Sequence, residues 1–268
     1  MYNGLHRFLI KGNRVLLAVD IGNTNIVFGL FEGDVLKTHW RIRTERNRTT
    51  DEYWVLVNEF LNLNKIGPAS IHNIVISCVV PPLIPVFEEL SRKYLENDPL
   101  VVGPGIKTGI PILYNNPAEV GADRIVNAIA GFEKYGGPLI IVDFGTATTF
   151  DAVSDKGEYM GGAIFPGLNI SLEALYKNTA KLSPVDIVLP EHVIGKSTKE
   201  SIQSGTVYGF VGVIDSIVSK MESEIGKPVQ VIGTGGVLPV IHKQVQSIQT
   251  VDPFLTLEGL RILYQRNR

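Results

Sequence analysis

The sequence predicts an α/β protein with two related halves, each a mixed sheet with helices packed on it, flanking a central cleft. Two observations predict this fold class. An apolar strand that ends in Asp-x-Gly, followed by a polar turn and two further strands, occurs twice in the chain. After each copy, helices and strands alternate, as in sheets covered by helices. Ligands usually bind where two such halves meet, so we expect the two Asp-x-Gly turns at a ligand site.

The repeat begins with AVDIGNTNIVFGL at residues 18–30 and returns as LIIVDFGTATTFDAVSDKGEYMGGAI from Leu139. A shift of 123 positions aligns Asp20 with Asp143 and Gly22 with Gly145. One isolated Asp-x-Gly would be read as an ordinary turn at the end of a strand. Two copies in register, each extended by Asn or Thr residues, favour a functional site instead.

In the first half, Thr49-x-x-Glu52 is a capping box that predicts the start of a helix, and Pro81-Pro82 ends a buried strand. The elements predicted after the first meander are helix 51–63, strand 71–80, helix 83–95 and strand 99–103. This half therefore has the order βββαβαβ.

The second half is preceded by a helix that Pro117 marks at its start. Ser197-x-x-Glu200 is a second capping box and opens a long helix. The other elements predicted after the second meander are helix 167–182, strand 229–233 and closing helices 237–246 and 256–267. Together these elements divide the chain into an N-terminal extension 1–14, a first domain 15–117 and a second domain 118–268.

The composition of the chain argues against nucleic acid and membrane as binding partners. With 44% hydrophobic and 19% charged residues, the chain has a soluble globular composition, and a net charge of -2 gives no basic stripe for a nucleic acid backbone. The apolar stretch Phe8-Leu9-Ile10 is too short for a signal peptide or a membrane span. The single cysteine, Cys78, excludes an internal disulfide and is typical of a reduced compartment. We therefore expect a cytoplasmic protein that binds neither nucleic acid nor membrane.

The polar turn after Asp20 has the residue types of a phosphate site. Small polar residues and glycine bring backbone N–H groups and hydroxyls close to phosphate oxygens, and Asp20 would hold Mg²⁺ through water. Near the C-terminus a strand runs into Gly233-x-Gly235-Gly236, where a flat ring could lie against the backbone.

A third polar group lies in YNNPAEVGADRIVNA. Asp123 and Asn127 are one helical turn apart on one face, so Asp123 could accept the proton of a bound hydroxyl while Arg124 fixes an anionic group. An exposed Asp–Arg pair on an ordinary amphipathic helix is the other interpretation that the spacing allows.

Two strings resemble motifs of other protein classes but do not meet their requirements. GKST at 195–198 lacks the glycine that a P-loop requires five positions earlier, where Pro190 stands. DFG at 143–145 is preceded by no His-Arg-Asp loop of a protein kinase. The five histidines have no metal-ligand spacing.

The strings DIGNTNIVFG, YNNPAEVGADRIVNA, DFGTATTFD, GGAIFPGL, GKSTKESIQSG and GTGG occur in this order from about Leu16 to the C-terminus. Together they closely resemble the type III pantothenate kinases. The resemblance implies a duplicated ribonuclease H-like fold of the actin-like ATPase type and a homodimer. It also implies transfer of the γ-phosphoryl group of ATP to the primary hydroxyl of pantothenate, the first step of coenzyme A synthesis.

The resemblance also implies roles for individual residues. The family's catalytic Asp matches Asp123, its monovalent cation site for K⁺ or ammonium matches Asp143, and a nucleotide contact matches Thr146. The phosphate loop corresponds to Asp20, Ile21, Gly22, Asn23, Thr24, Asn25, Ile26 and Val27. The pantothenate contacts correspond to Tyr114, Gly121, Ala122, Asp123, Arg124 and Thr198.

Two other functions stay open at this point. The phosphate-binding chemistry is shared by kinases that act on sugars or acetate, so only the acceptor residues argue for pantothenate. A nucleotide-binding regulator without turnover is a second alternative. The presence of Asp20, Asp123 and Asp143 argues against that regulator.

Overall fold

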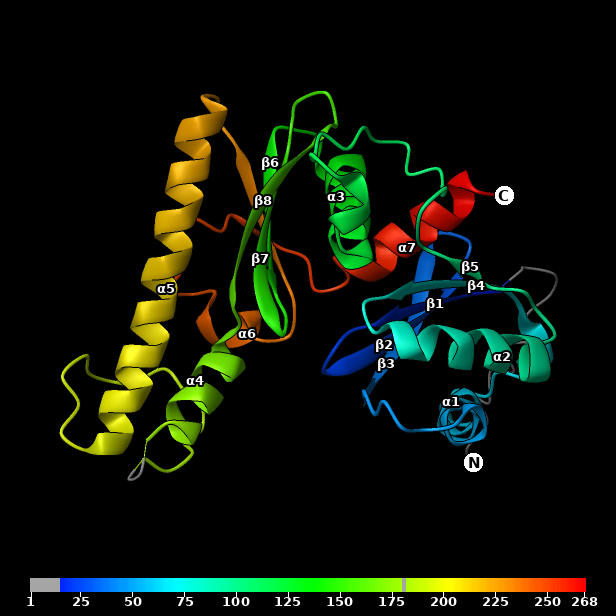
Figure 1. The fold of residues 1–268 in the computed structure, drawn as a ribbon, viewed down its shortest axis with the longest axis horizontal. Coiled ribbons are helices and arrows are strands. Elements are labelled where there is room, and N and C mark those ends of the chain that lie inside the picture. Colours follow the sequence, from blue (N-terminus) through cyan, green and yellow to red (C-terminus); the bar gives the residue numbers. More distant parts are fainter. Residues whose placement is uncertain (1–14, 180–181) are drawn as a thin grey trace, which may run out of the picture. The chain divides into compact units, whose positions relative to one another are not determined.

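A computed structural model of the protein describes residues 15–179 and 182–268, which form two compact units that divide between Val102 and Gly103 (Figure 1). The extension predicted over residues 1–14 lies outside the described residues. Segment 103–117, which the sequence analysis assigned to the first domain, is hydrogen-bonded to the second unit. The main-chain N–H of Leu113 donates to the carbonyl of Tyr159 at 2.8 Å.

Unit 1 is a mixed five-stranded sheet with the order β3-β2-β1-β4-β5. Its strands are β1 (Val15–Ile21), β2 (Asn25–Glu32), β3 (Val35–Arg43), β4 (Ile71–Cys78) and β5 (Leu100–Val101). The first three form an antiparallel meander, β4 is parallel to β1, and β5 is parallel to β4. Helices α1 (Thr50–Leu63) and α2 (Ile84–Leu95) pack on the sheet around buried rings such as Phe28, Tyr53 and Phe87. The predicted order βββαβαβ is confirmed.

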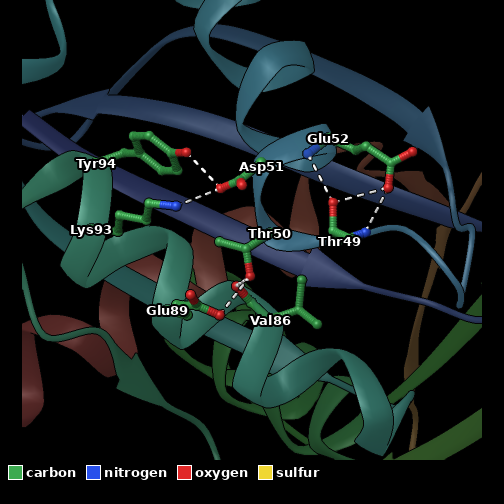
Figure 2. Close-up of polar contacts among 8 residues, drawn as sticks. All are labelled: Thr49, Thr50, Asp51, Glu52, Val86, Glu89, Lys93 and Tyr94. Carbon is green, nitrogen blue, oxygen red and sulfur yellow. Dashed lines mark hydrogen bonds and ion pairs between the residues drawn. The ribbon is translucent and has the colours of Figure 1, made fainter.

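The first turn of α1 shows why this helix begins where it does (Figure 2). Thr49 accepts a hydrogen bond from the main-chain N–H of Glu52, and the Glu52 carboxylate accepts one from the N–H of Thr49 at 2.8 Å. The predicted capping box is therefore confirmed. The next residue, Asp51, accepts hydrogen bonds from Lys93 and Tyr94 at 2.7 and 2.6 Å, which join α1 to α2.

Unit 2 is a mixed five-stranded sheet with the order β10-β9-β6-β7-β8. Its strands are β6 (Leu139–Phe144), β7 (Ala147–Val153), β8 (Tyr159–Pro166), β9 (Gln230–Thr234) and β10 (Thr250–Val251). Its helices are α3 (Ala122–Tyr135), α4 (Leu168–Lys177), α5 (Thr198–Ile225), α6 (Leu238–Ile241) and α7 (Leu255–Arg266). Helices α3 and α7 lie together on one face of the sheet, and α4, α5 and α6 cover the other (Figure 1).

The predicted internal repeat is present in the sheet registers. Asp20 near the end of β1 pairs with Val27 of β2, and Asp143 near the end of β6 pairs with Thr149 of β7. The second connection is one residue shorter than the first, and both aspartates are half-buried. Each unit therefore presents one carboxylate at the same point of its sheet.

Several predicted boundaries were wrong. Pro117 begins only a short 3-10 turn, Pro117–Glu119, and the α-helix starts later, at Ala122. Helix α4 ends at Lys177 rather than 182, because Asn178 caps it by donating from its side chain to the carbonyl of Ala174 at 2.7 Å. The helix predicted over 237–246 is the single turn α6, and the short edge strand β10 was missed.

Candidate active site

The turn between β1 and β2 has a fixed backbone and exposed polar side chains. Ile21 and Ile26 on either side are fully buried, so at these two positions only the backbone can contact a ligand. The N–H of Gly22 donates to the carbonyl of Asn25 at 3.0 Å, and a Cβ added to this glycine would lie 3.0 Å from the same oxygen. Residues 23–25 are exposed.

The segment after β3 braces this turn. The hydroxyl of Thr44 donates to the carbonyl of Gly22 at 2.7 Å, and its main-chain N–H donates to the carbonyl of Thr24 at 3.0 Å. The guanidinium of Arg46 donates to the side-chain oxygen of Asn23 at 3.1 Å. No pattern in the sequence predicted a role for Thr44 or Arg46. Their contacts fix the turn and bring a positive charge beside it.

Asp123 lies in the first turn of α3, directly after Ala122. Its Oδ1 accepts a hydrogen bond from the main-chain N–H of Arg124 at 2.8 Å. A Cβ added to Gly121 would lie 2.5 Å from that oxygen, so glycine leaves room for the folded-back carboxylate. Burial raises the pKa of Asp123, and the hydrogen bond and charge of Arg124 oppose this effect. The result is a half-buried carboxylate with a raised proton affinity.

Arg124 extends from α3 to the sheet and forms a buried ion pair. Its Nε lies 2.7 Å from Oδ1 of Asp151 on β7, and their side chains are 7% and 0% exposed. The hydroxyl of Tyr159 donates to the same oxygen at 2.8 Å, and that of Thr149 donates to Oδ2 at 3.0 Å. Burial raises the pKa of Asp151, and the charge of Arg124 with the hydrogen bonds of Tyr159 and Thr149 opposes this effect. The buried Nη2 of Arg124 has no hydrogen-bond partner in the described part of the chain.

Tyr114 and two glycines of β8 lie beside this ion pair. The rings of Tyr114 and Tyr159 have centroids 6.3 Å apart, and the Arg124 guanidinium lies 5.8 Å from the Tyr159 centroid. A Cβ on Gly161 would lie 3.6 Å from the Tyr114 ring, and one on Gly162 would lie 3.0 Å from Nη2 of Arg124. Because a Cβ on Gly162 would also lie 1.7 Å from the carbonyl oxygen of Phe150, glycine is required for this close approach of β7, β8 and the guanidinium.

Asp143 is held at the end of β6 by a chain of hydrogen bonds. Its Oδ2 accepts from the side chain of Asn127 at 2.8 Å, and Asn127 in turn accepts from the hydroxyl of Thr256 at 2.8 Å. A Cβ on Gly235 would lie 2.6 Å from Oδ1 of Asp143. Burial, with the negative charge of Asp123 as the next contribution, raises the pKa of Asp143 to about 7.

The structure brings together most of the unit 2 residues predicted from the sequence. The start of α3 links Tyr114 and Asp143. The Tyr114 ring contacts Tyr159 and interacts electrostatically with Arg124, and Asp123 interacts electrostatically with Asp143. Thr146 lies in the β6–β7 turn, where its carbonyl accepts the N–H of Gly167 at 3.1 Å. Thr198 is exposed at the first residue of α5, on the opposite face of the sheet from α3 (Figure 1). Within one chain, Thr198 is therefore separated from the α3 residues.

Sequence reasoning missed Asp151, Tyr159 and Thr256. One available signal was a charged residue inside the otherwise apolar strand FDAV, because buried carboxylates are rarely found without a partner. For Thr256 the sequence carries no such signal, since its contact with Asn127 depends on how α7 packs on α3.

Comparison with known proteins gives the family. The sequence model of the type III pantothenate kinases matches residues 16–220. Type III pantothenate kinases of Myxococcus xanthus and Geobacter sulfurreducens are 53% and 56% identical to this chain. They align with 94% and 95% of it, and with 99% and 100% of their own lengths.

Solved structures share the fold at low sequence identity. A conserved putative Baf family transcriptional activator from Campylobacter jejuni superposes with a TM-score of 0.59 at 19% identity, covering 94% of this chain and 98% of that one. The activator of 2-hydroxyisocaproyl-CoA dehydratase from Clostridium difficile, with bound ADPNP, superposes with a TM-score of 0.51 at 11% identity and covers 94% of each chain. The predicted duplicated fold of the actin-like ATPase type is confirmed. Among the helices of the described residues, none is long and apolar enough to cross a membrane.

Proposed function

The chain belongs to the type III pantothenate kinases, and from this premise we propose which of its residues perform the reaction. The protein is an ATP-dependent kinase that phosphorylates pantothenate in coenzyme A biosynthesis. The acceptor is therefore pantothenate rather than a sugar or acetate. Phosphoryl transfer needs mainly positioning and stabilisation of charge, so separate residues must hold the acceptor, take its proton and bind the phosphates.

The observation that carries the acceptor assignment is the unpartnered Nη2 of Arg124. A buried guanidinium N–H without a partner is costly, and a carboxylate is the group that Arg binds best. Pantothenate carries one carboxylate. We assign that carboxylate to Arg124, with the Tyr114 ring and residues 121–122 as further contacts of the acceptor.

Asp123 is the proposed proton acceptor. Its carboxylate is half-buried and held by the N–H of Arg124, and burial raises its pKa toward the range in which a general base works. Because Asp123 and Arg124 are adjacent, one residue would receive the hydroxyl proton while the next holds the other end of the same substrate.

The turn from Asp20 to Val27 in unit 1 is the proposed contact of the ATP phosphates, and Thr146 in the corresponding turn of unit 2 is a proposed nucleotide contact. Exposed polar residues 23–25 on a braced backbone, with Arg46 beside them, fit the oxygens of a phosphate chain. Asp20, half-buried at the end of β1, would hold Mg²⁺ through water. When bound, Mg²⁺ would neutralise charge on the phosphates.

Asp143 is the proposed site of a monovalent cation, K⁺ or ammonium. Oδ1 supports this proposal because it lies against Gly235, where an added Cβ would come 2.6 Å from Oδ1 and 2.6 Å from the main-chain nitrogen of Phe144, so that only glycine permits the approach. Oδ2 accepts the hydrogen bond of Asn127, so the carboxylate is oriented with Oδ1 toward Gly235. The bound ion would add positive charge near the nucleotide.

The position of Thr198 bears on whether the protein is a homodimer. Since Thr198 lies on the opposite face of the sheet from α3, it would reach the acceptor only from a second copy of the chain. This supports a homodimer in which each copy completes the other's acceptor site. The proposed subcellular location is the cytoplasm, where pantothenate and ATP are available.

The test compares acceptors. Purified protein with Mg-ATP and K⁺ is assayed for ADP release with pantothenate, with sugars and acetate, and with the alcohol analogue of pantothenate, in which CH₂OH replaces the carboxylate. We expect Arg124→Gln to raise the KM for pantothenate by roughly 10- to 100-fold, with little change for the alcohol analogue. Equal losses for both acceptors would remove Arg124 from the carboxylate site.

A further inference from the structure

We propose that Asp151, with Thr149 and Tyr159, is a positioning residue that turns the Arg124 guanidinium toward the acceptor and so sets the preference for an acceptor that bears a carboxylate. The inference rests on the proposed role of Arg124. It concerns a carboxylate that lies on β7, 27 positions from its partner, and to which none of the preceding assignments gives a function.

The ion pair between Arg124 and Asp151 has only one hydrogen bond. An arginine commonly binds a carboxylate with two parallel hydrogen bonds. Here Asp151 receives Nε on Oδ1 at 2.7 Å, while Nη2 of the same guanidinium makes no hydrogen bond within the described chain. The pairing is therefore one-sided, although both groups are buried and close enough for a strong contact.

Two hydroxyl groups hold the Asp151 carboxylate in the orientation that gives this single bond. The two hydroxyls of Tyr159 and Thr149 donate to Oδ1 and Oδ2 of Asp151 at 2.8 and 3.0 Å. They occupy lone pairs of both oxygens and fix the rotation of the carboxylate. With Oδ1 shared by Nε and Tyr159 and Oδ2 bonded to Thr149, Asp151 anchors Nε and leaves Nη2 without a hydrogen bond.

Residues close to Nη2 lie on β8 and on the segment of Tyr114. Gly162 of β8 has no side chain there, and an added Cβ would come 3.0 Å from Nη2 and collide with the carbonyl oxygen of Phe150. The Tyr114 ring, half-buried beside Gly161, borders the same region. The unpartnered N–H group thus lies close to the glycine backbone of β8, near an aromatic ring proposed as a contact of the acceptor.

The buried pair of Arg124 and Asp151 is costly for stability alone. A buried ion pair seldom stabilises a fold better than apolar side chains of the same volume, because both charges lose their hydration. An additional unsatisfied N–H makes the arrangement still more costly. A ligand carboxylate bound to Arg124 would offset that cost.

The test uses variants that loosen the support of Arg124 without removing the arginine. Thr149→Val and Tyr159→Phe each remove one hydroxyl, and Asp151→Asn removes the charge. We expect the KM for pantothenate to rise about 5- to 10-fold in the first two and roughly 100-fold in the third. The kcat and the KM for the alcohol analogue should change less than about twofold, a split that general damage to the fold would not give.

Thr148→Val is the matched control. Thr148 precedes Thr149 on β7 but points to the opposite face of the sheet, where its hydroxyl is buried without a partner among the residues described. This variant should leave both KM values unchanged. If Asp151→Asn fails to fold, as judged by its melting curve, Thr149→Val and Tyr159→Phe decide the question.

The outcomes separate the inference from the function on which it rests. If Arg124→Gln discriminates between the two acceptors and the Asp151, Thr149 and Tyr159 variants do not, the inference is wrong and the role of Arg124 stands. If Arg124→Gln affects both acceptors equally, the role of Arg124 falls and the inference falls with it. Selective loss in all four variants supports both.

Discussion

Asn127 of α3 donates a hydrogen bond of 2.8 Å to Asp143 at the end of β6. Thr256 of α7 donates to the side-chain oxygen of Asn127, which leaves the amide nitrogen for Asp143. Asp123 lies one turn earlier on the same helix and contributes to the raised pKa of Asp143. The proposed proton acceptor and the proposed cation ligand are therefore held by one helix.

The first prediction concerns Asp123. Replacing it by Asn keeps the shape of the side chain but removes the proton acceptor, so kcat should fall by roughly 10² to 10⁴ while the KM for ATP changes little. Steady-state ADP release measures both constants. Glu133→Gln is the control, because Glu133 lies on the same helix with a half-exposed carboxylate paired to Arg266. Unchanged kcat in Asp123→Asn would remove this residue from the mechanism.

The second prediction concerns Gly121. Its φ of -57° suits any residue, so Gly121→Ala should fold, but the new Cβ would lie 2.5 Å from Oδ1 of Asp123 and push the carboxylate out of place. We expect kcat to fall about 10-fold or more, since small displacements of a reacting group are costly. Gly205→Ala is the control in open space on α5, where alanine should raise the free energy of unfolding by about 0.5–1 kcal/mol. Equal kcat in wild type and Gly121→Ala would contradict the placement of Asp123.

Local patterns in the sequence predicted the features that local physics determines. The capping residues Thr49 and Ser197 mark the observed starts of α1 and α5, and the alignment of Asp20 with Asp143 is present in the sheet registers. The buried pair of Arg124 with a strand residue could not be predicted, because no periodic pattern links positions 27 apart. Boundaries such as the end of α4 depend on single side-chain caps, which patterns of apolar residues do not reveal.

The third prediction concerns Thr256. Thr256→Val removes the hydroxyl that fixes the amide of Asn127, so Asp143 loses a defined orientation and should bind K⁺ about fivefold more weakly. Two measurements check this: the K⁺ concentration for half-maximal activity and the rise in melting temperature on adding K⁺ without substrates. Thr256→Ser keeps the hydroxyl and should respond to K⁺ like the wild type. The same K⁺ response in Thr256→Val and wild type would disprove the proposed orienting role.

The last prediction joins pH to the monovalent cation. Burial raises the pKa of Asp143 from 3.8 to about 7, so the folded protein keeps a proton that the unfolded chain releases. The contribution of this carboxyl to the free energy of unfolding therefore falls as pH rises from about 4 to about 7 and is constant above that range. A cation that binds the ionised carboxylate favours that form and lowers its apparent pKa. K⁺ should then raise the melting temperature more at about pH 8 than at about pH 5.5.

The same linkage should appear in the kinetics. At low K⁺ the acidic limb of the kcat/KM profile should lie near pH 7, and added K⁺ should move it toward lower pH. Replacing K⁺ by Na⁺ at equal ionic strength should depress activity and reduce that shift, because a smaller ion fits the same oxygens less well. An acidic limb that stays in place at every K⁺ concentration, or equal rates in both salts, would show that Asp143 does not hold the cation.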